Sequence, residues 1–458
     1  MADPAPIPQP MAARFGKFVA DLEFEQLPER AVEAVRAGIV DFGACRFIGE
    51  HELVVQAIVA SLDTCGLSEE ASIGFAGIRC SAAEAALVNA AAAHASHIDD
   101  NALRNNHVSS VLAATALAAA EATGRDGRAV VTGYVAGYEV WARLVAAEAN
   151  PYGPKGWHST AVLGPVAAAA TASSIAGLNA TQAQAAIATA ASASGGLIAN
   201  FNDWVKPWQV GRAASTGITA AKLAKAGFRG GAGALDAGNG LLAALSPAGK
   251  LDPTRDMDTL GSDWAIEREG VNIKRYPWAL PCHRALDGIF ELLDQAPIDP
   301  ADVESIKVVI GTEEESVLAS RRVPEFRPLM SVQLAIAAAI ISGRVGAQEY
   351  APAFYDRADV RALMDKISIS VRDALTPDKD PNLGYRSALT VRMSDGSVRT
   401  SRDIQFPLGN WSSPLSAEQQ WGKFAEAAEP AIGPDRARRL FDRLRAIDQV
   451  TDLAAIAA

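Results

Sequence analysis

The six histidines of the chain stand at positions 51, 94, 97, 107, 158 and 283. Five of them lie in polar, loop-like stretches beside Gly, Pro, Asp or Asn. Histidine is the side chain whose unperturbed pKa lets it exchange protons near neutral pH. These stretches are therefore the first candidates for acid–base chemistry.

The first stretch contains His94, His97, Asp99 and Asp100, and it ends at His107 just before an apolar helical segment. If His94 and His97 lay on one helix face, they could form a divalent metal site with the two carboxylates. A more common arrangement is a polar helix end, in which Asp99 or Asp100 orients a histidine and Ser109 helps to cap the next helix. A loop that transfers protons is an intermediate possibility.

The second stretch places His158 immediately before an Ala-rich helical segment. The positive end of a helix dipole disfavours imidazolium, so a histidine in this position tends to stay neutral. A neutral imidazole can serve as a general base. The alternative interpretation is a simple helix cap made by Ser159.

The third stretch holds Lys206 between Trp204 and Trp208, ahead of a helix that we expect to begin at Gly211. An ammonium group together with backbone N–H groups at a helix start suits an anion. The alternative is a solvated surface lysine, which is the common state of this residue type.

The fourth stretch covers residues 274–284, where two prolines fix a loop and His283 opens the next helix. Such a loop is more typical of a wall presented to a ligand than of a plain connector. Cys282 beside His283 raises the alternative of a Cys–His nucleophile. Sequence neighbours seldom face one another in a helix, which weighs against that alternative.

The composition indicates the kind of partner to expect. At 458 residues the chain exceeds what one hydrophobic core usually supports, so two domains are expected. A net charge of -11 and the absence of a Lys/Arg block exclude a field that would attract nucleic acid. An acidic protein must gather cations locally to hold carboxylates, which gives weight to each candidate Lys, Arg and His.

Prolines interrupt the N-terminal stretch where a signal peptide needs continuous apolar residues, and the later Ala-rich runs are short or broken by polar groups. We therefore expect a cytoplasmic protein without a membrane span. The cysteines at positions 45, 65, 80 and 282 show neither a CxxC pair nor iron–sulfur spacing. Neither a disulfide nor a cluster is expected.

The periodicity predicts a mainly α protein. Residues 11–245 have the pattern of successive helices, clearest at 82–95, 108–122, 130–149 and 160–176. Strands are predicted at 305–310, 367–371, 388–393 and 398–404, with an Asp-Gly hairpin turn between the last two. We expect a large all-helical domain over residues 1–267 and a smaller α/β domain over 268–404. Helices at 416–428 and 435–446 could return to the first domain or complete the second.

Several segments together are similar, in order and spacing, to the motifs of one protein family. They are Asp99-Asp100 followed by His107-Val-Ser-Ser, Gly137-Tyr-Glu-Val140, Gly156-Trp-His158-Ser-Thr160 with Gly164, Lys206 with Gly211-Arg-Ala-Ala214, Gly227-Phe-Arg-Gly230, and Lys274-Arg-Tyr-Pro277 with His283. Over essentially its whole length the chain resembles the MmgE/PrpD family.

The resemblance implies an all-helical domain, a smaller α/β lid domain and a homodimer. The known reactions of the family are dehydration of 2-methylcitrate, decarboxylation of cis-aconitate and epimerisation of iminodisuccinate, none of which needs a metal or an organic cofactor. By position, the resemblance implies that His107, His158, Lys206 and His283 line the active site. The residues expected to contact the substrate are Asn101, His97, Asp99, Arg212, Lys274 and Arg275.

Three positions depart from the family pattern. His97 stands where many members have Asp, Gln209 stands where they have His, and Val108 replaces the proline after His107. These departures weigh against the family's familiar substrates, citrate-like acids especially.

We therefore expect a cofactor-independent lyase of the hydro-lyase type that acts on a small di- or tricarboxylate. In this hypothesis His158 removes a proton next to a carboxylate, cations including Lys206 hold the substrate, and His107 or His283 protonates the leaving group. The alternatives are an epimerase of an iminodisuccinate-like acid, a decarboxylase of a cis-aconitate-like acid, a non-catalytic carboxylate-binding relative, and a thiol hydrolase that uses Cys282.

Overall fold

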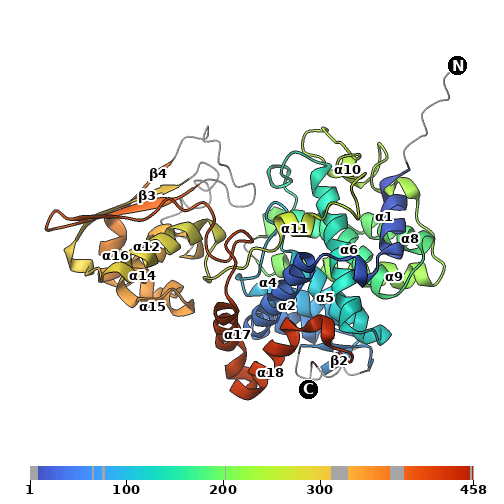
Figure 1. The fold of residues 1–458 in the computed structure, drawn as a ribbon, viewed down its shortest axis with the longest axis horizontal. Helices are drawn as coiled ribbons and strands as arrows, with labels where there is room; N and C mark the ends of the chain where they lie inside the picture. Colours follow the sequence, from blue (N-terminus) through green and yellow to red (C-terminus); the bar gives the residue numbers. More distant parts are fainter. Residues whose placement is uncertain are drawn as a thin grey trace. The chain divides into compact units, whose positions relative to one another are not determined.

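The computed structural model describes residues 9–63, 67–74, 78–201, 203–310, 328–371, 386–453 and 456. Cys65 lies outside these residues, so the expectation that it forms no disulfide stays a prediction. The contacts between Cα atoms divide the chain into two compact units, Met1–Val271 with Ala417–Ala458, and Asn272–Ser416. The described residues are mostly helical and contain two small sheets, as the sequence predicts for the fold class (Figure 1). Separate domains over residues 1–267 and 268–404 stay a prediction.

The first unit is built from helices that follow one another along the chain and from two helices near its end. They are α1 (Met11–Asp21), α2 (Glu29–Gly49), α3 (Leu53–Ala60), α4 (Ala82–Ala95), α5 (Val108–Thr123), α6 (Gly127–Ala146), α7 (Ser159–Ile175), α8 (Ala180–Ser192), α9 (Val205–Lys225), α10 (Leu241–Leu245), α11 (Ala265–Glu269), α17 (Ala417–Ile432) and α18 (Pro434–Arg445). The expectation of an all-helical unit is wrong in one detail, because β1 (Ala71–Ile73) and β2 (Ile78–Cys80) pair antiparallel.

Helix α9 packs backbone to backbone against both α4 and α7. A Cβ atom at Gly211 of α9 would overlap the Leu87 carbonyl of α4, and one at Gly217 would overlap Ala168 of α7. Glycine and alanine at these crossings let the helix axes approach closely. The small residues therefore fix the first turns of α9 between two helices whose ends carry histidines.

The predicted start of α9 at Gly211 is wrong, since the helix begins at Val205. Pro207 occupies the third position of its first turn. A proline is tolerated there because the first N–H groups of a helix have no partner within the helix. Lys206 consequently lies inside the first turn of α9 rather than before it.

The helices α17 and α18 pack against α2, a placement that the sequence left open. The ring of Phe424 on α17 lies 6.1 Å from that of Phe47 on α2, edge to face. A Cβ atom at Gly43 of α2 would meet both Phe424 and Leu444 of α18. The end of the chain is thus part of the core of the first unit (Figure 1).

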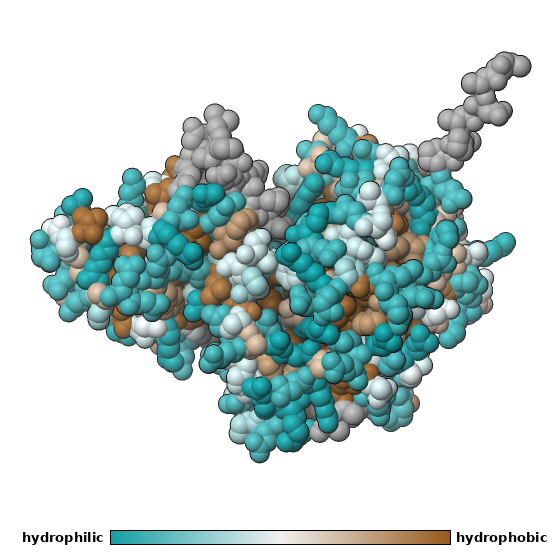
Figure 2. All heavy atoms as spheres, viewed as in Figure 1, coloured by the Kyte–Doolittle hydropathy of each residue, from teal (hydrophilic) through white to brown (hydrophobic). Residues whose placement is uncertain are grey.

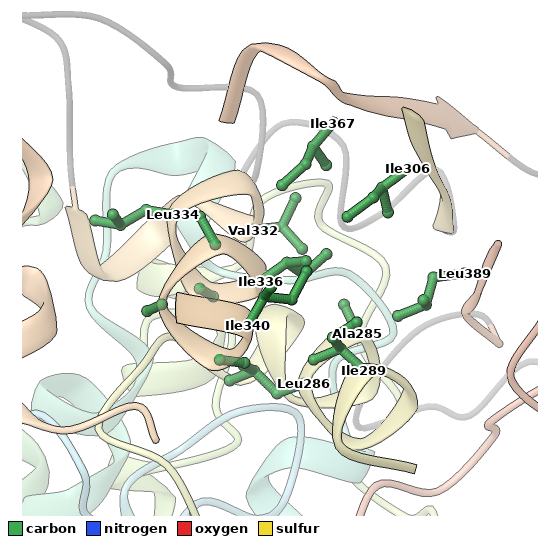
Figure 3. Close-up of a cluster of buried hydrophobic side chains, with 14 of the residues drawn as sticks. Ala285, Leu286, Ile289, Ile306, Val332, Leu334, Ile336, Ile340, Ile367 and Leu389 are labelled. Atoms are coloured by element: carbon green, nitrogen blue, oxygen red, sulfur yellow. The ribbon is translucent and has the colours of Figure 1, made fainter. Parts of the chain in front are cut away.

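The second unit combines a four-stranded sheet with helices. Its elements are α12 (His283–Gln295), β3 (Val303–Ile310), α14 (Val332–Ser342), α15 (Pro352–Tyr355), α16 (Ala358–Asp365), β4 (Ile367–Val371), β5 (Ala388–Met393) and β6 (Val398–Thr400). The strand order is β4-β3-β5-β6, with β3 parallel to β4 and antiparallel to β5. Figure 3 shows apolar side chains of α12 and α14 pointing toward Ile306, Ile367 and Leu389 of the strands.

The predicted hairpin between β5 and β6 is present. Gly396 adopts a φ of 85°, and the Asp395 carboxylate accepts a hydrogen bond from the Ser397 backbone N–H at 2.8 Å. The predicted strand over 398–404 is too long, because β6 ends at Thr400 and Ile404 forms only an isolated bridge with Ser387. The Ser401 hydroxyl accepts the Leu389 backbone N–H and so takes the place of a ladder partner.

On the face drawn in Figure 2, hydrophilic residues cover most of the surface and hydrophobic residues are scattered between them. Within the described ranges, no helix combines the length and the apolar character needed to cross a bilayer.

Candidate active site

Asp99 is the centre of a buried group of histidines in the first unit. One carboxylate oxygen of Asp99 lies 2.8 Å from Nδ1 of His94 and 3.0 Å from Nδ1 of His107. The same oxygen accepts a hydrogen bond from the Ser110 hydroxyl at 2.7 Å. Burial alone would raise the pKa of Asp99, but His107 and His94 hold it well below its usual range. Asp99 is therefore a buried carboxylate that orients two imidazoles.

His107 is the N-cap of α5, and its ring is fixed by two acceptors. Its Nδ1 faces the Asp99 carboxylate at 3.0 Å and the Asp100 carbonyl at 3.1 Å. Because both partners only accept hydrogen bonds, Nδ1 carries the proton. A carboxylate at this distance stabilises positive charge on the imidazole. His107 is thus arranged to hold and release a proton at Nε2.

His158 is the N-cap of α7 and has a different environment. Its Nδ1 lies 2.8 Å from Oε1 of Gln209. The Gln209 amide is oriented because its Nε2 donates to the Leu197 carbonyl at 3.1 Å. His158 therefore donates from Nδ1 and keeps its lone pair on Nε2. Burial, with the charge of Lys206 in addition, lowers the pKa of His158 to about 3 even though the Gln209 hydrogen bond opposes the shift.

Lys206 and His158 flank the same aromatic ring. The ring of Phe201 lies 4.7 Å from that of His158, and Nζ of Lys206 lies 5.3 Å from the Phe201 centroid. Burial is the largest cause of the lowered pKa values of His94 and His158, and the Lys206 ammonium lowers both pKa values further. A cation beside two neutral imidazoles is suited to an anionic ligand.

The histidine rings form one compact cluster. His94 lies 4.4 Å from His107 and 6.2 Å from His158, ring centroid to ring centroid. Burial lowers the pKa of His94 well below its ordinary value. The cluster therefore places His107, which is partly exposed and faces the Asp99 carboxylate, close to two more deeply buried imidazoles whose pKa values burial lowers. Such a difference between neighbouring titratable groups is the pattern expected for an acid and a base.

The loop between α4 and α5 carries this arrangement and is strained. His97, Leu103, Arg104 and Asn105 all have positive φ, between 49° and 72°. Non-glycine residues in this conformation persist only where the surroundings hold them, and they concentrate at functional sites. Asp100 contributes to that hold, because its carboxylate accepts the Ser109 backbone N–H at the start of α5.

These positions correct two expectations about the first stretch. His94 and His97 do not share a helix face, because α4 ends at Ala95 and His97 turns into the left-handed region with an exposed side chain. The alternative in which Asp99 orients a histidine is confirmed. The Ser109 side chain does not cap α5. Instead, the Asp100 carboxylate accepts the backbone N–H of Ser109 in the first turn of the helix.

Within the described residues, His94, Asp99 and His107 offer ligand atoms that lie within 4.8 Å of one another and could hold a metal ion. The two imidazoles and one carboxylate form a donor set that suits zinc and other divalent transition metals. The same Asp99 oxygen already accepts both imidazole Nδ1–H groups, so metal binding would require those protons to leave. A metal-free site stays a prediction.

Besides Asp99, three residues expected to bind substrate lie in the first unit, and their side chains differ in exposure. Asn101 is buried, its amide N–H₂ donates to Asn105, and its Oδ1 has no hydrogen-bond partner among the described residues. His97 is exposed. Arg212 donates to the Gly195 carbonyl at 3.0 Å and lies 5.8 Å from the Trp208 ring.

The remaining candidates belong to the second unit, and their part in the site stays a prediction. His283 is buried at the start of α12 and donates from Nε2 to the Trp278 carbonyl at 3.2 Å. Lys274 is buried, while Arg275 is exposed and lies 3.8 Å from the Asp287 carboxylate. The Cys282 thiol is fully buried, which weighs against its use as a nucleophile.

The Gly-Tyr-Glu-Val motif at residues 137–140 has a structural role. Glu139 is fully buried, pairs with Arg143, and accepts the backbone N–H groups of Ala265 and Ile266 at 3.1 and 3.0 Å. The Tyr138 hydroxyl donates to the Gly270 carbonyl at 2.6 Å. The motif therefore fastens α6 to the start of α11.

Sequence reasoning missed two buried charges behind the site, Asp41 on α2 and Lys423 on α17. The Lys423 ammonium donates to the Asp41 carboxylate and to the Ile98 carbonyl. An aspartate in the apolar segment 38–47 was a usable signal for Asp41. Lys423 had no comparable signal, since it lies in an ordinary amphipathic helix.

Comparisons with known proteins support the resemblance. The models of the MmgE/PrpD N-terminal and C-terminal domains match residues 13–254 and 276–449. The chain is 27% identical to cis-aconitate decarboxylase of Homo sapiens over 96% of this chain and 92% of that protein. It is 25% identical to cis-aconitate decarboxylase of Aspergillus terreus, over 96% and 93%, and 24% identical to the cis-aconitate decarboxylase-like protein oryM of Aspergillus oryzae, over 98% and 96%. The chain belongs to the MmgE/PrpD family.

Proposed function

We propose that this protein is a lyase that transfers a proton at a carbon next to a carboxylate of a small di- or tricarboxylic acid, without a cofactor. The observation that carries the proposal is the difference between two neighbouring histidines. Burial keeps His158 neutral with its lone pair on Nε2, whereas the Asp99 carboxylate stabilises a proton on His107. A base and an acid are thereby available within one cluster.

In a dehydration, His158 Nε2 takes the proton from the carbon next to a carboxylate, and Lys206 stabilises the negative charge that develops there. His107 gives its Nε2 proton to the departing hydroxyl, which leaves as water while the carbon–carbon double bond forms. Proton transfer between the imidazoles and solvent then restores both. Lys206 supports this role because its ammonium lies over the Phe201 ring, which His158 also contacts, and because its charge acts on His158.

A decarboxylation would use the same cluster but would begin without proton abstraction. The carbon–carboxylate bond breaks, carbon dioxide leaves, the double bond shifts, and His107 delivers a proton to the carbon next to the remaining carboxylate. The names of the relatives support this version, since they include cis-aconitate decarboxylases and a protein named as similar to them. Decarboxylation of a cis-aconitate-like acid is therefore the first reaction to test, and dehydration is the second.

The remaining candidates take supporting roles in the proposal. Asn101 has a buried Oδ1 that can accept a hydrogen bond from a substrate hydroxyl or protonated carboxyl group. Roles in substrate binding for Lys274, Arg275 and His283 stay part of the proposal, as do the family homodimer and the cytoplasmic location. Return of the proton to the opposite face would make the enzyme an epimerase.

The test is proton NMR of the purified, chelator-treated protein in D₂O with cis-aconitate, citrate, methylcitrate, malate, tartrate and iminodisuccinate. We expect a new alkene signal, or deuterium next to a carboxylate, with at least one acid. His158→Gln should abolish the signal of a dehydration and His107→Gln that of a decarboxylation, whereas His51→Gln should abolish neither, since His51 is an exposed histidine of the same unit. Silence with every acid would contradict the proposal, and a ligand-induced rise in Tm without any product would favour a carboxylate-binding protein instead.

A further inference from the structure

Behind the histidine cluster lies a second layer of buried charge that the reaction does not touch. Lys423 of α17 donates to the Asp41 carboxylate and, at 2.9 Å, to the backbone carbonyl of Ile98. The Lys423 side chain is 10% exposed and that of Asp41 is 1% exposed. Ile98 immediately precedes Asp99, the carboxylate that orients both imidazoles. A cation from the end of the chain therefore contacts the backbone of the site loop.

The ion pair is part of a larger set of buried polar contacts around the site loop. The second carboxylate oxygen of Asp41 lies 3.8 Å from the buried Cys45 sulfur. Asp100, which follows Asp99 in the loop, accepts the Ser109 backbone N–H with its carboxylate. The Ser109 hydroxyl in turn lies 2.7 Å from the Tyr134 hydroxyl. The loop is thus fastened on one side by α17 and α2 and on the other by α5 and α6.

A loop with four non-glycine residues at positive φ needs such fastening. The Ile98 carbonyl accepts its hydrogen bond from the charged Lys423 ammonium, and a charged donor makes a stronger hydrogen bond than a neutral donor. Loss of that bond would free the backbone next to Asp99, and a displacement of about 1 Å at a catalytic group can lower a rate by about 100-fold.

We propose that Lys423 is a positioning residue for the reaction, which fixes Asp99 through the Ile98 carbonyl and so sets the orientation of His94 and His107. The predicted effect on kcat rests on the proposed function, whereas the predicted effect on the orientation of the two imidazoles does not. The helix α17, far from the site in sequence, thereby becomes part of the catalytic apparatus.

The experiment compares Lys423→Met with the double variant Lys423→Met/Asp41→Asn. The single variant leaves Asp41 as an uncompensated buried charge and is expected to lower Tm strongly. The double variant removes both charges, so the fold should recover while the contact with Ile98 stays absent. Lys222→Met is the matched control, because Lys222 also pairs with an acid but does so at the surface.

Two measurements separate the inference from the proposed function. In the substrate-free protein, ¹⁵N NMR of the imidazoles should show that the His94 and His107 resonances shift in the folded double variant. The same resonances should keep their wild-type positions in the control. With an active acid, the double variant should lose about 10- to 100-fold in kcat with little change in KM. If the wild type has no lyase activity, the imidazole spectra still decide.

Unchanged imidazole spectra in a folded double variant would overturn the inference, as would an unchanged kcat. Failure of the double variant to fold would also overturn it, because Lys423 would then serve the stability of the whole unit rather than the loop.

Discussion

Replacement of Gln209 by Glu should create an acidic limb in the pH–rate profile. The Gln209 oxygen lies 2.8 Å from Nδ1 of His158, whose pKa burial lowers to about 3. A carboxylate in that place adds a negative charge whose interaction with imidazolium, at an effective dielectric constant of about 20 and a charge separation of about 4 Å, is about 4 kcal/mol. Observed shifts for such pairs are about 1–3 pKa units, so the pKa of His158 should rise to roughly 4–6.

The assay is kcat/KM for the active acid between pH 4 and 8. In the wild type His158 stays neutral over this whole range, so its protonation produces no acidic limb. Gln209→Glu should create or raise a limb near pH 4–6, with activity recovering above it. Gln182→Glu provides the control, since it makes the same change in the capping box of α8. An identical profile for wild type and Gln209→Glu would refute the assignment of His158 as the base.

Three further outcomes follow from the structure. Glu139→Ala should lower the free energy of unfolding by about 3–5 kcal/mol in urea, because the buried Arg143 would lose its ion-pair partner and keep only backbone carbonyls as acceptors. A loss near zero would contradict the structural role of the motif. The folded pKa of His158 lies below its unfolded value of about 6.5, so the stability that the neutral imidazole contributes is complete above pH 6.5 and is lost as the pH falls toward 3. Over that range the free energy of unfolding of the wild type should fall by up to about 1.4 kcal/mol per pH unit more than that of His158→Gln. Parallel curves of stability against pH would be evidence against a neutral buried imidazole. Dialysis against a chelator should leave kcat unchanged; loss of activity that zinc restores would show instead that His94, Asp99 and His107 bind a metal.

The helices and the hairpin could be predicted because their signals are local. The segment 82–95 coincides with α4, since Ser81 and Glu84 mark its start and an alanine-rich run follows. The turn at Asp395 and Gly396 likewise identifies β5 and β6. The start of α9 was misplaced because Pro207 resembles a break although the first turn of a helix tolerates it.

For the candidate site, the sequence indicated residues but not their contacts. Family motifs indicated His107, His158 and Lys206, and the structure brings Asp99, His94 and Gln209 to them. The metal alternative with His97 assumed that α4 continues past Ala95, whereas the chain turns there. The pairing of Lys423 with Asp41 joins residues 382 positions apart, which no local pattern can indicate.

The division of labour between His158 and His107 is tested most directly by deuterium exchange with the active acid in D₂O. If that acid is a substrate for dehydration, His107→Gln should still exchange the hydrogen next to the carboxylate, because His158 remains, but it should form no alkene. His158→Gln should lose both exchange and product. Exchange that survives in His158→Gln and disappears in His107→Gln would contradict the assignment of base and acid.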